Sequence, residues 1–346
     1  MYLQELAAEL VMHVYRQCSS VIDVLNLSRT CRRMHQLLPA SDKISILAQA
    51  IDKELGPLQD IIQVITFNES QSAHVIRSPP LSYALLRQSI RVGKIAQSYE
   101  DLYPSYRWNS NYVNRRALTT EERYHLRRAI YRHWLYAKAF HNRAHPRSTR
   151  LLPAVVAERC QLLRVWTTEE LVEIEDVRGM LEDIVATRIC PSIGEVQRRL
   201  CGSSFAWERQ PWNIRRKPDQ SSLMQSLYHD ARDNFTCNAK TDTYDYLGEG
   251  WGDDISNYYV VQSFLKLDPA QIMWLFSNAN CRSDVEAFVR ELGEDWFMDN
   301  GATLLDTIML VLHSRGLELE YVRQGVLDGD MGVAVNHSCI DCAVVI

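Results

Sequence analysis

The chain contains no hydrophobic run long enough to cross a membrane. Its longest apolar stretch, 303–312, is interrupted by Asp306, whereas a membrane-spanning helix needs about 20 consecutive apolar residues. The amino terminus carries Glu5 and Glu9 in place of a basic region followed by an apolar core, so it does not resemble a signal peptide. We therefore expect a protein of the cytoplasm, the nucleus or both, without membrane contact.

Closely spaced cysteines are almost absent. Of the nine cysteines only Cys339 and Cys342 lie near each other, and scattered thiols are typical of a reducing compartment, where they pack as small hydrophobic side chains. His337 lies beside this pair, but structural zinc needs four ligands and the neighbouring sequence offers no further ligand pair. The sequence therefore predicts no metal centre.

The motifs of common enzyme classes are also missing. The glycines at 248–252 have neither P-loop nor Rossmann spacing, and the acidic residues around them and at 328–330 do not follow the EF-hand pattern. His141 and His145 are four residues apart, but the glutamate of a zincin helix is not between them. We expect no cofactor and no catalytic residue, with an enzyme site in the 248–254 loop as the weakest alternative.

What the chain does contain is helical periodicity over almost its whole length. Apolar residues recur at spacings of three and four, which is typical of amphipathic helices. Capping-box patterns at 119–122 and 167–170 predict helices that run to about residues 140 and 189, and a similar pattern is expected to cap a helix at 283–286. No repeat of 20–50 residues is present, which excludes solenoid and propeller arrays. The sequence predicts an all-α fold.

Two domains are expected from this pattern. Residues 1–40 form a small helical unit, and residues 41–346 form a larger irregular helical domain. Within the larger domain the span 202–220 lacks a helical period and contains two tryptophans and two prolines. The larger domain is therefore either a single body or two subdomains that part near 203–220.

The first forty residues predict three short helices. Apolar residues on one face mark the first, Ser20 and Asp23 resemble a capping box that begins the second, and Pro39 ends the third. About forty residues bury too little surface to be stable alone, so a unit of this size packs on a neighbour or a partner. The apolar face of the first helix comprises Leu3, Leu6, Leu10 and Val14.

This segment resembles an F-box, through which substrate receptors attach to the Skp-type adaptor of cullin-RING ubiquitin ligases. Ala7 stands where the family has proline. Segments 118–124 and 131–136 also resemble fungal F-box proteins. The residues that carry the likeness are Leu6-Ala7-Ala8-Glu9-Leu10, Val14, Leu25-Asn26-Leu27 and Thr30-Cys31-Arg32-Arg33.

The resemblance implies a non-catalytic substrate receptor for ubiquitin-dependent degradation. Its partners would be a Skp-type adaptor, bound by residues 1–40, and an unknown substrate protein, bound by the larger domain. The expected buried anchors are Leu6, Leu10, Val14 and Leu25, with Glu9 and Arg32 as contacts at the rim. The alternative is a structural or regulatory helical protein without a link to ubiquitin, in which the first helices pack into the protein's own core.

Charge is distributed unevenly along the chain. Residues 1–150 contain 21 Lys and Arg against 12 Asp and Glu, whereas residues 151–346 contain 17 against 31. Arginines interleaved with aromatic residues over 115–134 suggest nucleic-acid binding, but their helical spacing favours the solvated face of a core helix. We therefore expect no nucleic-acid partner, and we consider that the basic half could instead meet the acidic half within the molecule.

Overall fold

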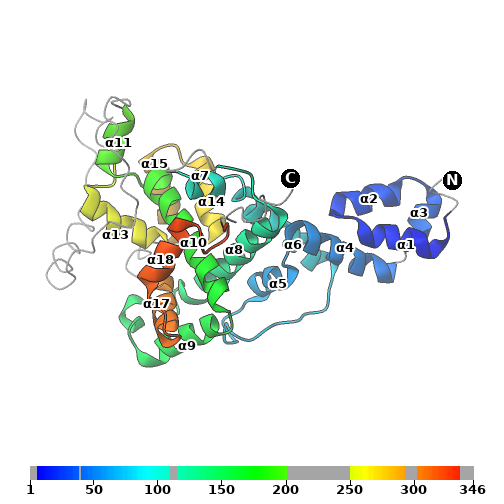
Figure 1. Cartoon of the computed structure of the whole chain (residues 1–346), viewed down its shortest axis with the longest axis horizontal. Helices are drawn as coiled ribbons and strands as arrows, with labels where there is room; N and C mark the ends of the chain where they lie inside the picture. Colours follow the sequence, from blue (N-terminus) through cyan, green and yellow to red (C-terminus); the bar gives the residue numbers. More distant parts are fainter. Residues whose placement is uncertain (1–5, 39, 110–114, 201–249, 294–301, 336–346) are drawn as a thin grey trace, which may run out of the picture.

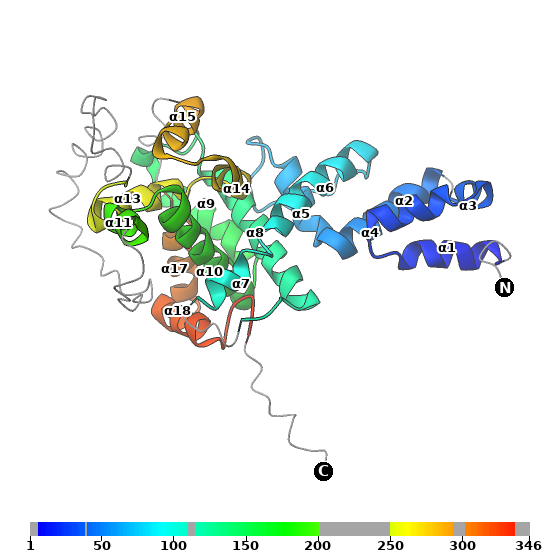
Figure 2. The ribbon, with the colours of Figure 1, turned by 90° about the horizontal axis from the view of Figure 1, so that it is seen from above.

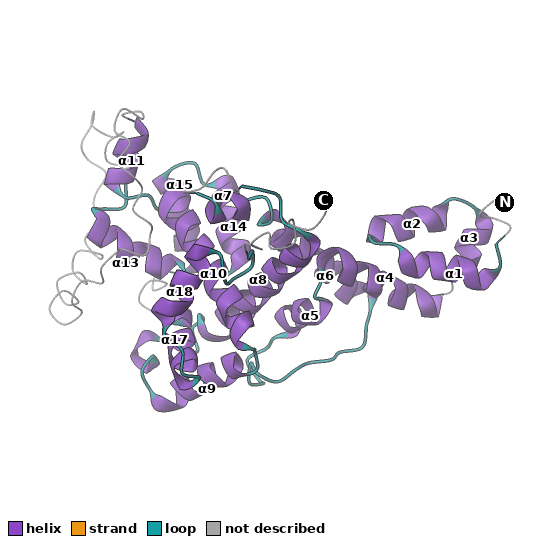
Figure 3. Ribbon diagram, in the orientation of Figure 1, coloured by secondary structure: helices purple, strands orange, loops and turns teal. Residues whose placement is uncertain are grey.

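The computed structural model describes residues 6–38, 40–109, 115–200, 250–293 and 302–335. All regular structure in these ranges is helical (Figure 3), which confirms the predicted all-α fold. None of the helices in the described part of the chain has the length and apolar character needed to span a bilayer.

Three short helices form an N-terminal unit, as the sequence predicts: α1 (Ala8–Gln17), α2 (Val21–Arg29) and α3 (Arg32–Leu37). Ser20 caps α2, because its side-chain oxygen accepts a hydrogen bond from the Asp23 N–H at 3.1 Å. The buried Tyr15 hydroxyl donates to the main-chain oxygen of Met34 at 3.1 Å and ties α1 to α3. Figures 1 and 2 place this unit at one end of the long axis of the molecule.

Helix α4 (Ala40–Leu55) carries the N-terminal unit and joins it to the larger body. Helices α1 and α2 pack on α4, which in turn packs on α5 (Leu58–Thr66) and α6 (Tyr83–Ser98). Gly93 permits a close approach of α6 to α4, because a Cβ atom at this position would lie 2.7 Å from a side-chain carbon of Leu55. The unit is thus connected to the body through one helix that both share.

The centre of the body is the pair α8 (Thr120–Phe140) and α10 (Thr168–Ile184), which pack against each other. The predicted capping boxes at 119–122 and 167–170 are both present at the starts of these helices. A π-helical turn, η4 (Val185–Ile189), extends α10 and ends before Pro191. Other helices before residue 201 are α7 (Tyr103–Arg107), the 3₁₀ turn η3 (Arg147–Thr149), α9 (Pro153–Arg164) and α11 (Ile193–Leu200).

The later helices return to the same core. Helix α14 (Pro269–Asn278) packs on α6, α8 and η4, while α17 (Leu304–Ser314) and α18 (Leu319–Asp328) pack on α10. The Asn257 side chain donates to the main-chain oxygen of Cys190 at 2.7 Å, so the segments on either side of 201–249 are in contact. The expected boundary at 203–220 lies outside the described residues and stays a prediction. This part of the chain also contains α13 (Asp254–Phe264) and α15 (Arg282–Leu292).

The expected cap at 283–286 is wrong. Helix α15 begins at Arg282, one residue before the predicted cap, and the Asp284 carboxylate accepts the Cys281 N–H at 3.2 Å. Glu286 pairs with Arg282 at 2.8 Å, one helical turn away. The pairs Cys281–Asp284 and Ser283–Glu286 both place an acidic residue three positions after a small side chain. Spacing alone therefore does not show which pair caps the helix.

Candidate protein-docking surface

Helix α1 has two apolar faces, and only one of them is buried. Val11 and Tyr15 are each 1% exposed and point toward the rest of the unit. They are four residues apart and therefore lie on one side of the helix. The inner face of α1 thus already has its packing partners within the chain.

Of the residues that the sequence analysis selected, Leu10 and Val14 lie on the outer face of α1, whereas Leu6 precedes the helix and, like Leu25, packs against the protein's own core. Leu10 is 52% exposed, whereas Leu6 and Val14 are half-buried. Leu25 on α2 is also half-buried, and Ile22, which the sequence analysis did not select, is 61% exposed. Large apolar side chains are thus left uncovered by the described residues on both α1 and α2.

The two polar residues expected at the rim are exposed as well. Glu9 lies in the first turn of α1, and Arg32 lies in the first turn of α3. The neighbouring Arg33 donates to the main-chain oxygen of Leu6 at 2.6 Å, which holds the start of α1 against α3. Of the two adjacent arginines, Arg33 thus connects α3 to the start of α1.

Polar contacts fix the N-terminal unit on α4. The Val21 N–H donates to Glu54 at 3.1 Å, and Lys53 donates to the main-chain oxygen of Arg16 at 2.6 Å. Val24 and Met34 of the unit are buried as part of the hydrophobic core. Hence the unit packs inward on α4 with one side and presents apolar residues outward with the other.

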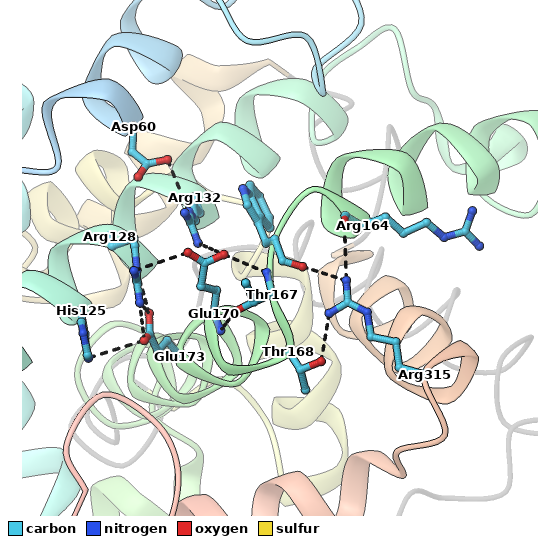
Figure 4. Close-up of polar contacts among 11 residues, drawn as sticks. Asp60, His125, Arg128, Arg132, Arg164, Thr167, Thr168, Glu170, Glu173 and Arg315 are labelled. Carbon is cyan, nitrogen blue, oxygen red and sulfur yellow. Dashed lines mark hydrogen bonds and ion pairs between the residues drawn. The ribbon is translucent and has the colours of Figure 1, made fainter.

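The arginines of α8 do not form a solvated face, contrary to the sequence expectation. Arg128 pairs with Glu173 at 2.6 Å and with Glu170 at 3.4 Å, and Arg132 pairs with Glu170 at 2.9 Å. Arg132 also reaches Asp60 of α5 at 3.4 Å (Figure 4). The basic first half and the acidic second half of the chain therefore meet inside the molecule, as the charge distribution suggested.

Burial shifts the titration of this charged layer. Burial raises the pKa of Glu173 above its usual value even though Arg128 opposes the shift. Burial raises the pKa of Asp60 as well, against the opposing effect of Arg132. At Glu170 burial also raises the pKa, but the hydrogen bond from the Thr167 N–H and the interaction with Arg132 have the larger combined effect. The pKa of Glu170 is therefore lowered. Burial therefore decides the direction of the pKa shift at Glu173 and Asp60, whereas hydrogen bonding and the charge of Arg132 decide it at Glu170.

The arginines around the start of α8 are also paired. Arg116 donates to Glu122 at 2.6 Å, and Arg127 donates to Glu100 at 2.7 Å. A cleft of about 920 Å³ lies beside them, between α6, α7 and the start of α8, and its walls carry both signs of charge. A nucleic-acid interface needs a continuous basic surface, and this cleft does not offer one.

The acidic loops and histidines considered as metal ligands have structural roles where they are described. Asp253 caps α13 by accepting the Ser256 N–H at 2.8 Å. His141 contacts the Lys266 main-chain oxygen at 3.1 Å and accepts the Thr303 N–H at 3.2 Å. Among the described residues no three His, Cys, Asp or Glu side chains are grouped as metal ligands. Residues 248–249 and 337–342 lie outside the described ranges.

Comparisons with protein-family models, with curated proteins and with solved structures found no match for this chain. The distinguishing feature of the N-terminal unit is a helix with a packed inner face and an open outer face at the far end of the molecule.

Proposed function

We propose that the N-terminal unit binds a Skp-type adaptor and that the chain is an F-box-type substrate receptor of a cullin-RING ubiquitin ligase in the cytoplasm or nucleus. The observation that supports this proposal best is the exposure of Leu10 on a helix whose neighbouring face is already packed by Val11 and Tyr15. The described residues leave this face uncovered, so a partner polypeptide can cover it.

The exposed apolar side chains of α1 and α2 would each contribute modestly to a protein contact. Complete burial of a Leu or Ile side chain contributes about 1.5–3 kcal/mol. Leu10 and Ile22 expose 52% and 61% of their surface, so each would contribute roughly 1–1.5 kcal/mol on docking. Val14 is half-buried and would contribute less. Leu6 and Leu25 already pack against the protein's own core and would contribute least, while Glu9 and Arg32 would act at the rim.

In this role the chain performs no chemistry itself. A receptor accelerates ubiquitin transfer by holding a target lysine near a conjugating enzyme, which raises the effective concentration of the two reactants. The larger helical body would bind the target protein. The ion pairs between α8 and α10 would keep that body rigid while the N-terminal unit, at the far end of the molecule, stays available to the adaptor.

Co-purification with a Skp-type adaptor tests the proposal, using the full chain and the variant Leu10→Asp. We expect the full chain to retain the adaptor and the variant to lose at least tenfold in affinity, because a carboxylate would be buried in an apolar contact. Leu151→Asp is the matched control, since Leu151 is 82% exposed and lies shortly before α9, outside the N-terminal unit. Adaptor retention by Leu10→Asp, or its absence in the unmodified chain, would contradict the proposal.

A structural or regulatory helical protein without a link to ubiquitin is the second candidate. It is favoured by the inner face of the unit, where Val11, Tyr15 and Met34 pack and Glu54 binds the Val21 N–H. In that case removal of residues 1–38 would lower the melting temperature of the rest, and no Skp-type adaptor would bind the intact chain.

A further inference from the structure

Arg77 presents a buried positive charge without a partner. It lies in the long loop between α5 and α6 (Figure 3) and is only 8% exposed. None of its three guanidinium nitrogens has a hydrogen-bond partner in the described part of the chain. Moving a cation out of water without a counter-charge costs several kcal/mol, so this arrangement needs an explanation other than stability.

The backbone of Arg77 is held firmly on α5. Its N–H donates to the Gln63 side-chain oxygen at 2.9 Å, and its main-chain oxygen accepts from Gln63 at 2.7 Å and from Gln59 at 3.1 Å. Three hydrogen bonds thus fix the point from which the guanidinium extends. A donor group that is held in place before binding loses little entropy when a ligand arrives.

The surroundings of the guanidinium offset the charge only in part. The Phe67 ring lies 5.3 Å from the guanidinium carbon, in cation–π range, but a ring face satisfies none of the N–H donors. Burial lowers the pKa of Arg77, and no carboxylate opposes this shift. In the same segment the Nδ1 atom of His74 is also buried without a hydrogen-bond partner among the described residues.

The loop that carries these groups also exposes apolar side chains. Val75 and Ile76 are exposed directly beside the buried Arg77, and residues 76–82 form no helix or strand. The residues on both sides of Arg77, Ile76 and Ser78, are therefore open to solvent.

We propose that Arg77 is the binding group of an oxyanion site, which accepts a carboxylate or phosphate group through the paired N–H donors of its guanidinium. The planar fork of arginine matches two oxygens of one such group, and Phe67 would support the opposite face. The site is separate from the outer face of α1 and does not depend on the adaptor proposal.

Thermal unfolding of the full chain tests this site with two simple anions, acetate and inorganic phosphate, each compared with chloride at equal ionic strength. We expect acetate, phosphate or both to raise the melting temperature of the unmodified chain by about 2–4 °C. A response to acetate alone identifies a carboxylate site, and a response to phosphate alone identifies a phosphate site. The increase in melting temperature with either anion should be absent in the variant Arg77→Met, which lacks the guanidinium.

Arg87→Met is the matched control, because Arg87 is an exposed arginine on the neighbouring helix α6 and should keep the full anion response. In chloride alone, Arg77→Met should melt a few degrees above the unmodified chain, since methionine keeps the contact with Phe67 without the buried charge. The proposal is overturned if neither anion stabilises the unmodified chain, if Arg77→Met keeps the response, or if Arg77→Met fails to fold.

Discussion

Acidification is expected to destabilise this chain through the buried histidine His133. The side chain lies on α8 and is 1% exposed. Burial lowers its pKa from 6.5 to about 3, and the positive charge of Arg178 acts in the same direction while Glu175 opposes it. His141, at the end of α8, behaves alike: its partly buried ring has a pKa of about 3, mainly because of desolvation.

The sign and size of the effect follow from the difference between the folded and unfolded chains. Below pH 6.5 the unfolded chain takes up a proton on His133, whereas the folded chain does so only near pH 3. Stability is therefore complete above pH 6.5 and falls as the pH drops toward 3. At pH 4.5, two units below 6.5, the loss from His133 is about 2.7 kcal/mol, a large part of a typical folding free energy.

Urea denaturation at pH 7.5 and pH 4.5 measures this loss. His133→Phe removes the titrating group, so its free energy of unfolding should fall by about 2–3 kcal/mol less than that of the unmodified chain over the same interval. His13→Gln is the matched control, since it replaces an exposed histidine on α1. An equal fall in His133→Phe and in the unmodified chain would refute the reasoning.

Three further perturbations test the packing. Val11→Asp should lower the free energy of unfolding by at least about 3 kcal/mol because it buries a charge, whereas Leu10→Asp should leave it within about 0.5 kcal/mol; equal losses would show that both faces of α1 are packed. Arg128→Met should cost about 3–5 kcal/mol by leaving Glu173 buried without its partner, and the double change with Glu173→Met should recover most of this loss in a double-mutant cycle. Gly332→Ala should lower the melting temperature by several degrees, because its φ is +100° and the new Cβ would lie 2.5 Å from a buried carboxylate oxygen; an unchanged melting temperature would contradict that geometry.

Local patterns predicted the helices well where the signal lies within a few residues. The capping boxes that begin α8 and α10 depend on four neighbouring positions, and both are present. The ion pairs of Arg128 were not predictable in the same way, because Glu173 is 45 residues away in the sequence. The only sequence signal for them is the opposite net charge of the two halves of the chain.

The orientation of α1 was only partly predictable. Leu10 and Val14 form an apolar stripe, but Val11 and Tyr15 form another on the other side of the same helix. Tyr15 points inward, where its hydroxyl donates a hydrogen bond to the Met34 main-chain oxygen. Helical periodicity cannot predict a contact between residues 19 positions apart. The unpaired guanidinium of Arg77 gave no sequence signal at all, because it results from the path of the loop between α5 and α6.

Hydrogen exchange of the full chain, measured with and without a purified Skp-type adaptor, tests the docking proposal most directly. We predict that amides in α1 and α2 become protected on addition of the adaptor, while those in α8 and α10 are unchanged. Exchange in α1 and α2 that is the same with and without the adaptor would contradict the account.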